Sequence, residues 1–564
     1  MNSTIKKSLS VVMCTAMLAS VAGCSSSGTP STSTAPSQSS AASPASGSQA
    51  ESSAASGSEA APASDGTVAM PISAEPITLS YFIKMNSAMS ATMPTYEDVE
   101  CFKKLEEMTN IHIEWIHPSS NDQFNLMITS NDLPDLINWQ LTTAKGGSEA
   151  LINDGIIIPL TDKMAEFAPN YTRIMNANPE LKKTTLLDDG TEYQFINFNY
   201  DPTDNSIKVF KILGPYIRKD WLDKVGLGIP KTTDEMYTVL KAFKDNDVNG
   251  NGDPNDEIPF VCGKSLEPVR VLSGAFGTRD SFHMKDGEVV YGPTQPEFKE
   301  YLTMINKWYS EGLINSDFPV NDNPGAKILS NEAGSTYASM GSGLIMQSTA
   351  LAEEYPGAEL VSMPWLTGPN GDHSVIYDSN ANPRATAITT ANKHVEESLR
   401  WIDYAYSAEG SMLTTFGIEG VSYEMKDGYP TLTDLVMNNT MGYNQEEAIA
   451  RYCLGPINYP NARDYRFYEQ VNLDTEMKRQ IQVDWTQATE DICMPPITMN
   501  TQESAQYSSV MADIKTYVDE MQVKFMIGDE SLDNFDTFVK NIEGMGIDQA
   551  IEIQKAALAR YGQR

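Results

Sequence analysis

The sequence has few positive charges. Its 40 Lys and Arg residues face 75 Asp and Glu residues, which gives a formal net charge of −35 at pH 7. Because such a surface repels phosphate groups, an anionic membrane surface is a poor partner, and we expect no binding of nucleic acid. The same charge suits an exported protein that meets millimolar divalent cations.

The sequence also lacks the common catalytic motifs. It has no Gly-x-Ser-x-Gly elbow, no His-Glu-x-x-His pair and no glycine-rich phosphate loop. His112 and His117, two of the five histidines, lie five apart on a predicted strand, so they point to opposite faces and cannot share a metal ion. Paired carboxylates are frequent, which keeps a glycoside hydrolase as an alternative. No set of residues supports catalysis, and we expect no enzyme.

No run of 18 apolar residues follows the N-terminal region, so no membrane-spanning helix is predicted. Lys6 and Lys7 precede a mostly apolar stretch, residues 9–21, that is too short to span a bilayer. We therefore interpret residues 1–23 as a signal peptide. Val21-Ala22-Gly23-Cys24 resembles a bacterial lipobox, which implies cleavage before Cys24 and a lipid, with palmitate-type chains, on its sulfur. An ordinary secretory signal is the alternative.

Residues 24–70 are nearly all Ser, Ala, Pro, Gly and Thr. Such a segment cannot bury enough apolar surface to offset the entropy lost on ordering, so we expect a disordered tether. Beyond it the cysteines are few and far apart, at Cys101, Cys262, Cys453 and Cys493. Their even number permits disulfides, and buried free thiols are an equal alternative.

The folded part begins with the pattern of a parallel sheet covered by helices. Strands are predicted at 77–83 and 111–116, helices near 96–110 and 123–130, and a third strand before Trp139. Later apolar periodicity predicts helices near 296–311, 395–407, 505–525 and 547–559. Trp221, Trp308 and Trp401 fall within such apolar patterns, and we interpret them as core residues. The fold class is α/β.

Residues 244–260 place carboxylates and amides at alternate positions around two glycines. A hard cation such as calcium requires this arrangement of oxygens on a sharply turned backbone. Two overlapping frames fit, one starting at Asp245 and one at Asp247. A predicted helix with Thr232 and Glu235 at capping-box spacing leads into the loop, and a strand entry follows it, so a helix–loop–helix EF-hand is not predicted. A solvated acidic turn is the alternative.

Several blocks together resemble family 1 extracellular solute-binding proteins of the large lipoprotein type, the capture subunits of ABC importers for carbohydrates. These blocks are the lipobox and tether, Ser130-Asn-Asp-Leu-Pro-Asp-Leu, Ile217-Arg-Lys-Asp-Trp-Leu-Asp-Lys-Val-Gly-Leu, the acidic loop, Tyr406-Ser-Ala-Glu-Gly, Gly417-Ile-Glu-Gly-Val and Tyr517-Val-Asp-Glu-Met. The resemblance implies a two-lobed periplasmic-binding-protein-like fold (class II type) with hinge strands between the lobes. It also implies a structural calcium ion, whose ligands would be Asp247, Asn249, Asn251, Asp253, Asp256 and Glu257.

The resemblance sets the expected organisation. Lobe 1 would comprise residues 76–205 plus about 370–440, and lobe 2 about 206–369 plus about 441–564. We expect a monomer on the outer face of the bacterial cell membrane, held by its lipid, that captures a carbohydrate, with an oligosaccharide favoured, and delivers it to ABC permease subunits. A receptor for a peptide or another small solute, and a sensory partner of a membrane kinase, are alternatives, because the scaffold does not decide among them.

A sugar site needs flat aromatic rings to stack on and planar polar groups to reach hydroxyls. Trp139 follows a strand end, where open α/β sheets bind their ligands, and Trp365 lies in a loop without helical partners. These two are the favoured stacking candidates, and a structural role is the alternative interpretation for each. The weaker candidates are Tyr193, Tyr377 and Tyr423, with Arg218 and Arg384 as planar partners for hydroxyls or a carboxylate.

Overall fold

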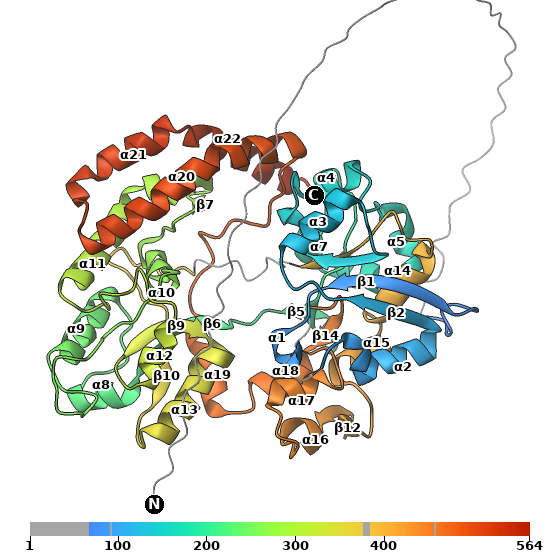
Figure 1. Cartoon of the computed structure of the whole chain (residues 1–564), viewed down its shortest axis with the longest axis horizontal. Helices are drawn as coiled ribbons and strands as arrows, with labels where there is room; N and C mark the ends of the chain where they lie inside the picture. Colours follow the sequence, from blue (N-terminus) through green and yellow to red (C-terminus); the bar gives the residue numbers. More distant parts are fainter. Residues whose placement is uncertain (1–66, 91–92, 376–383, 456–457) are drawn as a thin grey trace, which may run out of the picture. The chain divides into compact units, whose positions relative to one another are not determined.

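The computed structural model describes residues 67–90, 93–375, 384–455 and 458–564 (Figure 1). The predicted signal peptide, Cys24 and most of the predicted tether lie outside these residues, and so does Tyr377. Among the residues that are described, no helix combines the length and the apolar content needed to cross a membrane.

The first sheet has four strands in the order β11-β3-β1-β2. β1 (Ile77–Ile83) pairs in parallel with β2 (Ile111–Ile116) and β3 (Leu136–Trp139), and β11 (Ala385–Ile388) joins β3 in the antiparallel direction. α2 (Glu100–Thr109) and α3 (Asp122–Ser130) connect the parallel strands. The predicted succession of strands and helices is therefore confirmed.

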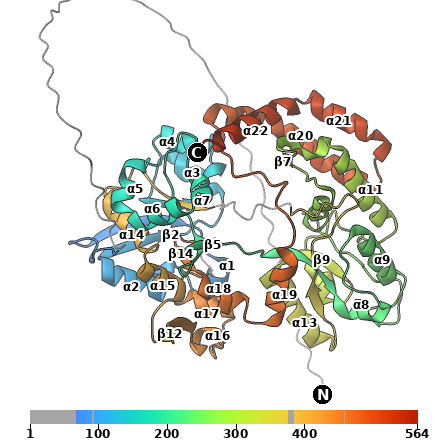
Figure 2. The same cartoon turned by 180° about the vertical axis from the view of Figure 1, so that it is seen from behind.

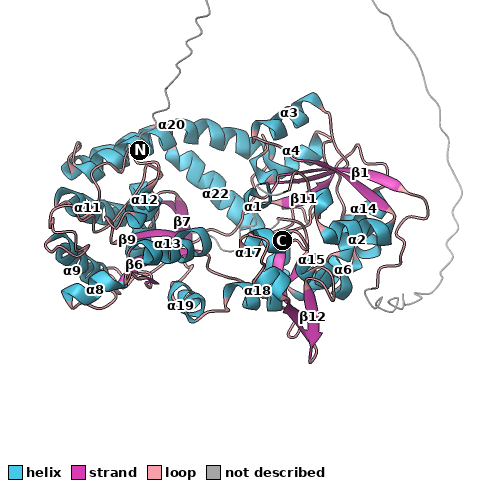
Figure 3. Cartoon of the chain, turned by 60° about the horizontal axis from the view of Figure 1, so that its bottom comes forward, coloured by secondary structure: helices cyan, strands magenta, loops and turns pink. Residues whose placement is uncertain are grey.

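Further helices cover this sheet and complete the first core (Figure 3). They are α4 (Gly147–Asn153), α5 (Thr161–Phe167), α6 (Pro169–Ala177), α7 (Pro179–Lys183), α14 (Val395–Tyr404) and α15 (Ala408–Phe416). Trp401 on α14 is buried in this core, as its apolar pattern predicts. Asp403, also on α14, accepts hydrogen bonds from the Asn170 and Tyr171 backbone N–H groups (3.2 and 2.8 Å) and from the Asn170 side chain (2.9 Å), so it caps the start of α6.

The second core forms around an antiparallel sheet in the order β10-β6-β9. Its strands are β6 (Leu213–Arg218), β9 (Ser335–Ser339) and β10 (Leu360–Ser362). Trp221 on α8 (Lys219–Val225) and Trp308 on α11 (Pro296–Ser310) are buried here, as predicted. α9 (Thr233–Lys244) and the C-terminal helices α20 (Thr501–Ile527), α21 (Phe535–Gly544) and α22 (Ile547–Tyr561) complete it, and α20 and α22 lie side by side (Figure 2).

Shorter elements connect these parts. The helices are α1 (Ser87–Ser90), α10 (Glu267–Arg270), α12 (Pro324–Leu329), α13 (Met346–Glu354), α16 (Asp434–Met437), α17 (Gln445–Ala450), α18 (Tyr465–Asn472) and α19 (Glu476–Trp485). The strands are β4 (Phe198–Asp201), β5 (Ser206–Lys208), β7 (Phe282–Lys285), β8 (Glu288–Tyr291), β12 (Tyr423–Lys426), β13 (Tyr429–Leu432) and β14 (Ala462–Asp464).

The packing after residue 441 differs from the expected lobe boundary. β14 pairs in parallel with β4, and Ala450, Leu454 and Tyr459 belong to the first core, whereas the expected boundary assigned this segment to lobe 2. Its turn-rich sequence carries no periodicity that indicates which sheet it joins. The chain returns to the second core at α19, where Trp485 donates a hydrogen bond to the Pro215 carbonyl (3.1 Å). The other lobe boundaries stay a prediction.

We expect Asp403→Ala to lower the free energy of unfolding by about 3 kcal/mol, because it leaves three buried N–H donors without their acceptor. Chemical denaturation measures this loss. Glu476→Ala is the control, since its carboxylate is mostly exposed and its loss should cost under about 1 kcal/mol. Equal losses in the two variants would contradict the capping role.

Candidate functional site

Two segments that cross between the two cores lie against a third segment, which joins two helices of the second core. The first is residues 209–212, between β5 and β6, the second approaches Val375, and the third is residues 486–500, between α19 and α20. Val375 N–H donates to the Thr489 carbonyl (2.8 Å), and the hydroxyls of Ser374 and Thr489 are 3.0 Å apart. Lys211 on the first segment forms an ion pair with Glu490 on the third. These contacts make one bundle of crossing segments.

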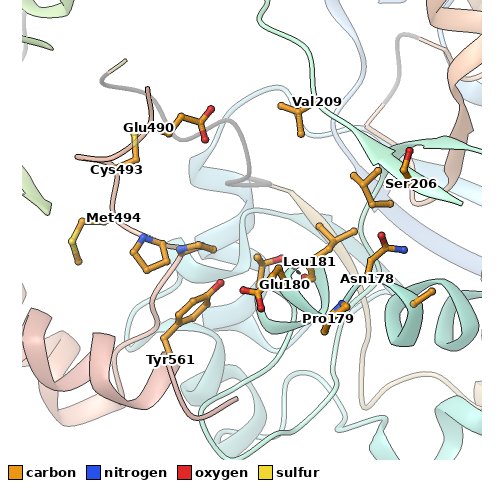
Figure 4. Close-up of a pocket in the computed structure, with 15 residues that line it drawn as sticks. Asn178, Pro179, Glu180, Leu181, Ser206, Val209, Glu490, Cys493, Met494 and Tyr561 are labelled. Atoms are coloured by element: carbon orange, nitrogen blue, oxygen red, sulfur yellow. Dashed lines mark hydrogen bonds between the residues drawn. The ribbon is translucent and has the colours of Figure 1, made fainter. Parts of the chain in front are cut away.

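A cavity of about 640 Å³ lies beside this bundle (Figure 4). One wall comes from the α6–α7 corner and another from β5 and the residue that follows it, while residues 490–496 and Tyr561 complete the lining. The lining residues are Ala177, Asn178, Pro179, Glu180, Leu181, Thr184, Ser206, Ile207, Val209, Glu490, Cys493, Met494, Pro495, Pro496 and Tyr561. This volume is typical of small-molecule sites.

The lining combines apolar surface with hydrogen-bonding groups. Leu181, Ile207 and Val209 provide apolar contacts, and polar side chains such as Asn178 and Ser206 provide donors and acceptors. Burial raises the pKa of the Tyr561 phenol, so this ring is neutral at neutral pH and keeps its O–H as a donor. The cavity therefore suits a ligand that has both apolar faces and hydroxyl groups.

A cluster of charges fixes the C-terminal end of α22 next to this cavity. Arg560 binds Asp188 (2.5 Å) and Glu503 (2.5 Å), and Arg564 binds the other oxygen of Asp188 (2.5 Å) and the Lys183 carbonyl (3.1 Å). Burial opposes ionisation of Asp188, but hydrogen bonds from Arg560 and Arg564 outweigh it and lower the pKa of Asp188. This cluster holds Tyr561 against α7. The sequence gives no signal for it, because Asp188 and the two arginines are hundreds of residues apart.

None of the six described candidates for sugar binding lines this cavity. The structure brings two of them together at the end of β3, where the Arg384 guanidinium lies 5.3 Å from the Trp139 ring. Trp139 is only 6% exposed and stacks on Phe124. Trp365 is buried against Tyr337 in a small cluster near the third crossing segment.

The two described tyrosine candidates are core residues. Tyr193 is buried in the first core, and Tyr423 packs on Phe416 beside α15. The strand-end and loop contexts of these residues did not indicate how deeply their rings are buried. A ligand role for any of the predicted residues stays a prediction.

Arg218 has a complete set of protein partners. Its guanidinium binds both oxygens of Asp220 (2.8 and 2.7 Å) and the Asn331 side chain (2.6 Å), and it lies over the Trp221 ring. The side chain is 2% exposed. These contacts account for Arg218 as a structural residue that joins the end of β6 to α8.

The acidic loop after α9 gathers oxygen atoms in the frame that starts at Asp247. The Asp247 carboxylate accepts hydrogen bonds from the backbone N–H groups of Gly250 (2.8 Å) and Gly252 (3.0 Å). The Asp256 carboxylate accepts from the side-chain amide nitrogens of Asn249 (2.9 Å) and Asn251 (2.5 Å). As predicted, a capped helix leads into the loop, with Thr232 accepting from Glu235 N–H, and isolated β-bridges at Ile258 and Phe260 follow it.

Glu257 closes the same loop from inside the protein. One of its oxygens accepts from Val248 N–H (2.9 Å), and the other is buried without a hydrogen-bond partner. Burial raises the pKa of Glu257. In the described part of the chain no three acidic, His or Cys side chains lie close enough to form a metal cluster, so a cation here would also need the amide oxygens of Asn249 and Asn251. The donor set fits such an ion.

Two other acidic residues of the loop have partners of their own. Asp253 accepts a hydrogen bond from the Asn255 side chain, and Asp245 lies 3.9 Å from Lys241.

A family model described as bacterial extracellular solute-binding protein matches residues 91–412, more than half of the chain. The chain belongs to this family. The family comprises substrate-binding proteins and not enzymes, so the chain is a solute-binding protein.

Two curated relatives extend the match. The fructooligosaccharide ABC transporter substrate-binding protein FusA of Streptococcus pneumoniae is 26% identical over 509 residues, covering 85% of this chain and 90% of the relative. Lipoprotein LipO of Bacillus subtilis is 26% identical over 473 residues, covering 80% of this chain and 85% of the relative.

Solved structures share the fold. A FusA EF-hand mutant in complex with fructo-nystose has a TM-score of 0.68 at 23% identity, and the match covers 86% of this chain and 99% of FusA. The alginate-binding protein AlgQ2 without calcium ion has a TM-score of 0.65 at 24% identity, with the same coverage. The predicted two-lobed α/β solute-binding fold is therefore confirmed.

We expect Arg218→Ala to lower the free energy of unfolding by roughly 3–5 kcal/mol, because it leaves Asp220 and Asn331 without their buried partner. Thermal and chemical unfolding measure the loss. Lys219→Ala, which removes a more exposed pair with Asp223, is the control and should cost under about 1 kcal/mol. A stable Arg218→Ala protein that had lost only ligand affinity would restore Arg218 as a binding residue.

Proposed function

We propose that this protein captures an oligosaccharide outside the cell and delivers it to the permease subunits of an ABC importer. Family membership supports the capture of a solute. The relatives support the ligand class, since FusA is named for fructooligosaccharides and AlgQ2 for alginate. The observation that carries the proposal is the cavity beside the crossing segments, whose mixed lining matches the apolar faces and hydroxyl rims of sugar rings.

The position of the cavity supports a closure mechanism. Its walls come from the first core at α6 and α7, from the crossing segments, and from Tyr561 at the end of the second core's last helix. A ligand that contacts all three walls favours the arrangement in which they are close together, by its difference in affinity for the two arrangements. Trp139 with Arg384, and Trp365, remain proposed additional sugar contacts.

We further propose that the protein is a monomer held at the outer face of the cell membrane through a lipid on Cys24. The lipobox-like sequence supports the anchor, and the matched LipO is named a lipoprotein. The long Ser- and Ala-rich segment after Cys24 would let the folded part reach a permease.

We propose a structural calcium ion in the loop that starts at Asp247. The buried oxygen of Glu257, which has no hydrogen-bond partner, supports it, and so do the carboxylates of Asp247 and Asp256 in the same loop, beside the amides of Asn249 and Asn251. Two of the solved structures also support it, since one is an EF-hand mutant of FusA and the other is AlgQ2 without calcium ion. Calcium would satisfy the carboxylates that crowd this loop.

For the ligand, we expect titration calorimetry to detect binding of an oligosaccharide from a panel of defined chain lengths, with no hydrolysed product. Bound sugar should also slow the modification of Cys493 by a thiol reagent, since Cys493 lines the cavity while Cys101, Cys262 and Cys453 are buried. Peptide mass spectrometry locates the modified cysteine.

A tyrosine pair supplies the matched control for this test. Tyr561→Ala should weaken binding by roughly threefold to tenfold through loss of an aromatic contact, whereas Tyr429→Ala, an exposed ring remote from the cavity, should not. Sugar binding that leaves the modification rate of Cys493 unchanged would show that the sugar binds at a different site. Failure of every sugar to bind would overturn the proposed function.

For the metal, we expect a chelator to lower the melting temperature and calcium to restore it. Ion at a hundredfold excess over its dissociation constant stabilises the folded state by about 2.7 kcal/mol. Asp247→Ala should abolish the response, whereas Asp245→Ala, which removes a carboxylate outside the cluster, should keep it. Identical melting curves with chelator and with calcium would contradict the proposal.

A further inference from the structure

The described residues that line the cavity beside the crossing segments carry no positive charge. Among its described lining residues there is no Lys, Arg or His, while Glu180 and Glu490 both contribute carboxylates. A carboxylate-bearing sugar such as a uronate would therefore meet acidic groups and no cation among the described lining residues.

Six basic residues adjacent to or paired with the described lining segments are engaged by acids of the protein. Lys183 binds Glu180 (2.9 Å), Lys211 binds Glu490, and Arg560 and Arg564 share Asp188. Lys182 binds Glu192 (3.3 Å), and Lys208 binds Asp201 and Asp204 (3.3 and 2.8 Å). A uronate would have to displace one of these internal acids to gain a cation of its own.

The pair formed by Lys211 and Glu490 matters most, because it lies in the bundle of crossing segments. Glu490 lines the cavity and Lys211 does not, so the acid presents its charge to the ligand. Lys211 is 15% exposed, and Gln482 holds its backbone through two hydrogen bonds (3.3 and 2.8 Å). The lysine is thus fixed behind the acid.

We propose that the cavity selects neutral oligosaccharides against uronic-acid oligosaccharides, and that Glu490 enforces this choice by covering the charge of Lys211. This inference rests on the proposed function of the same cavity. The selection is repulsive, since two like charges at one site destabilise the wrong complex. A hydroxyl group meets no such penalty, because it can donate a hydrogen bond to either carboxylate.

The test compares neutral and uronic-acid oligosaccharides of equal length by calorimetry on the full chain. A panel of neutral fructo-, manno- and gluco-oligosaccharides is set against oligogalacturonides of two to six residues. We expect oligogalacturonides to bind at least about tenfold more weakly than the best neutral sugar at low salt. Affinity for the neutral sugar should change little between about 20 and about 300 mM salt, because added salt screens interactions between charges and a neutral sugar has none.

Glu490→Gln is expected to uncover Lys211 and to raise oligogalacturonide affinity by about tenfold, with a new dependence on salt. Glu180→Gln, which releases Lys183 on the opposite wall, serves if the first variant does not fold. Glu476→Gln is the matched control, because it frees Arg479 at an exposed position away from the cavity and should leave selectivity unchanged.

Each outcome decides between the proposals. Preference for a neutral sugar together with improved uronate binding in Glu490→Gln supports the inference. Equal or tighter binding of oligogalacturonides to the unmodified protein overturns it and leaves oligosaccharide capture standing. Neutral preference that Glu490→Gln does not alter overturns the role of Glu490. Binding of neither class overturns both the inference and the proposed function.

Discussion

The contacts among the crossing segments are the constraint on which the rest of the structure depends. Each core buries its own apolar residues, the chain passes between the two cores near Lys211 and Val375, and both passages contact residues 489–490. Because both passages bond to the same third segment, a movement of one lobe against the other would bend all three segments together. The cavity shares residues with the bundle, so a bound ligand acts directly on the parts that would move.

A second connection between the cores lies at the C-terminal end of the chain. Thr501 at the start of α20 donates its backbone N–H to Glu149 on α4 (3.1 Å), and Asp188 binds the arginines at the end of α22. Helices of the second core therefore reach the first core at their ends. Tyr561 lies one residue beyond Arg560, so the same charge cluster sets the position of one wall of the cavity.

The sequence predicted features that local periodicity determines. Alternating strand and helix patterns located β1, β2 and α3 to within a residue or two, and the capped helix before the acidic loop was also located correctly. These features follow from which face of one segment is apolar, and neighbouring residues contain that information.

The cavity could not be predicted from the sequence, because its walls come from four segments that no local pattern connects. The lining segments become neighbours only when the chain has crossed between the cores; they are residues 177–184, 206–209, 490–496 and 561. The turn-rich sequence of residues 441–472 gave no indication of where one of these crossings occurs. Aromatic type alone does not decide the role of a residue either, because a ring at a strand end can fill the core or stack on a sugar. Trp139 and Tyr423 show this, since each packs on a phenylalanine.

The acidic loop and the cavity are separate sites, yet a chain of contacts joins them. The Asn249 carbonyl in the loop accepts from the Asn331 side chain (3.2 Å), and the Asn331 oxygen accepts from Arg218 at the end of β6. The other end of β6 follows the first crossing segment and Lys211. A cation in the loop would thus fix Asn331 and Arg218, and through them the strand that carries the cavity's charge pair. Its effect on the ligand would come through the rigidity of the second core, because no loop residue lines the cavity.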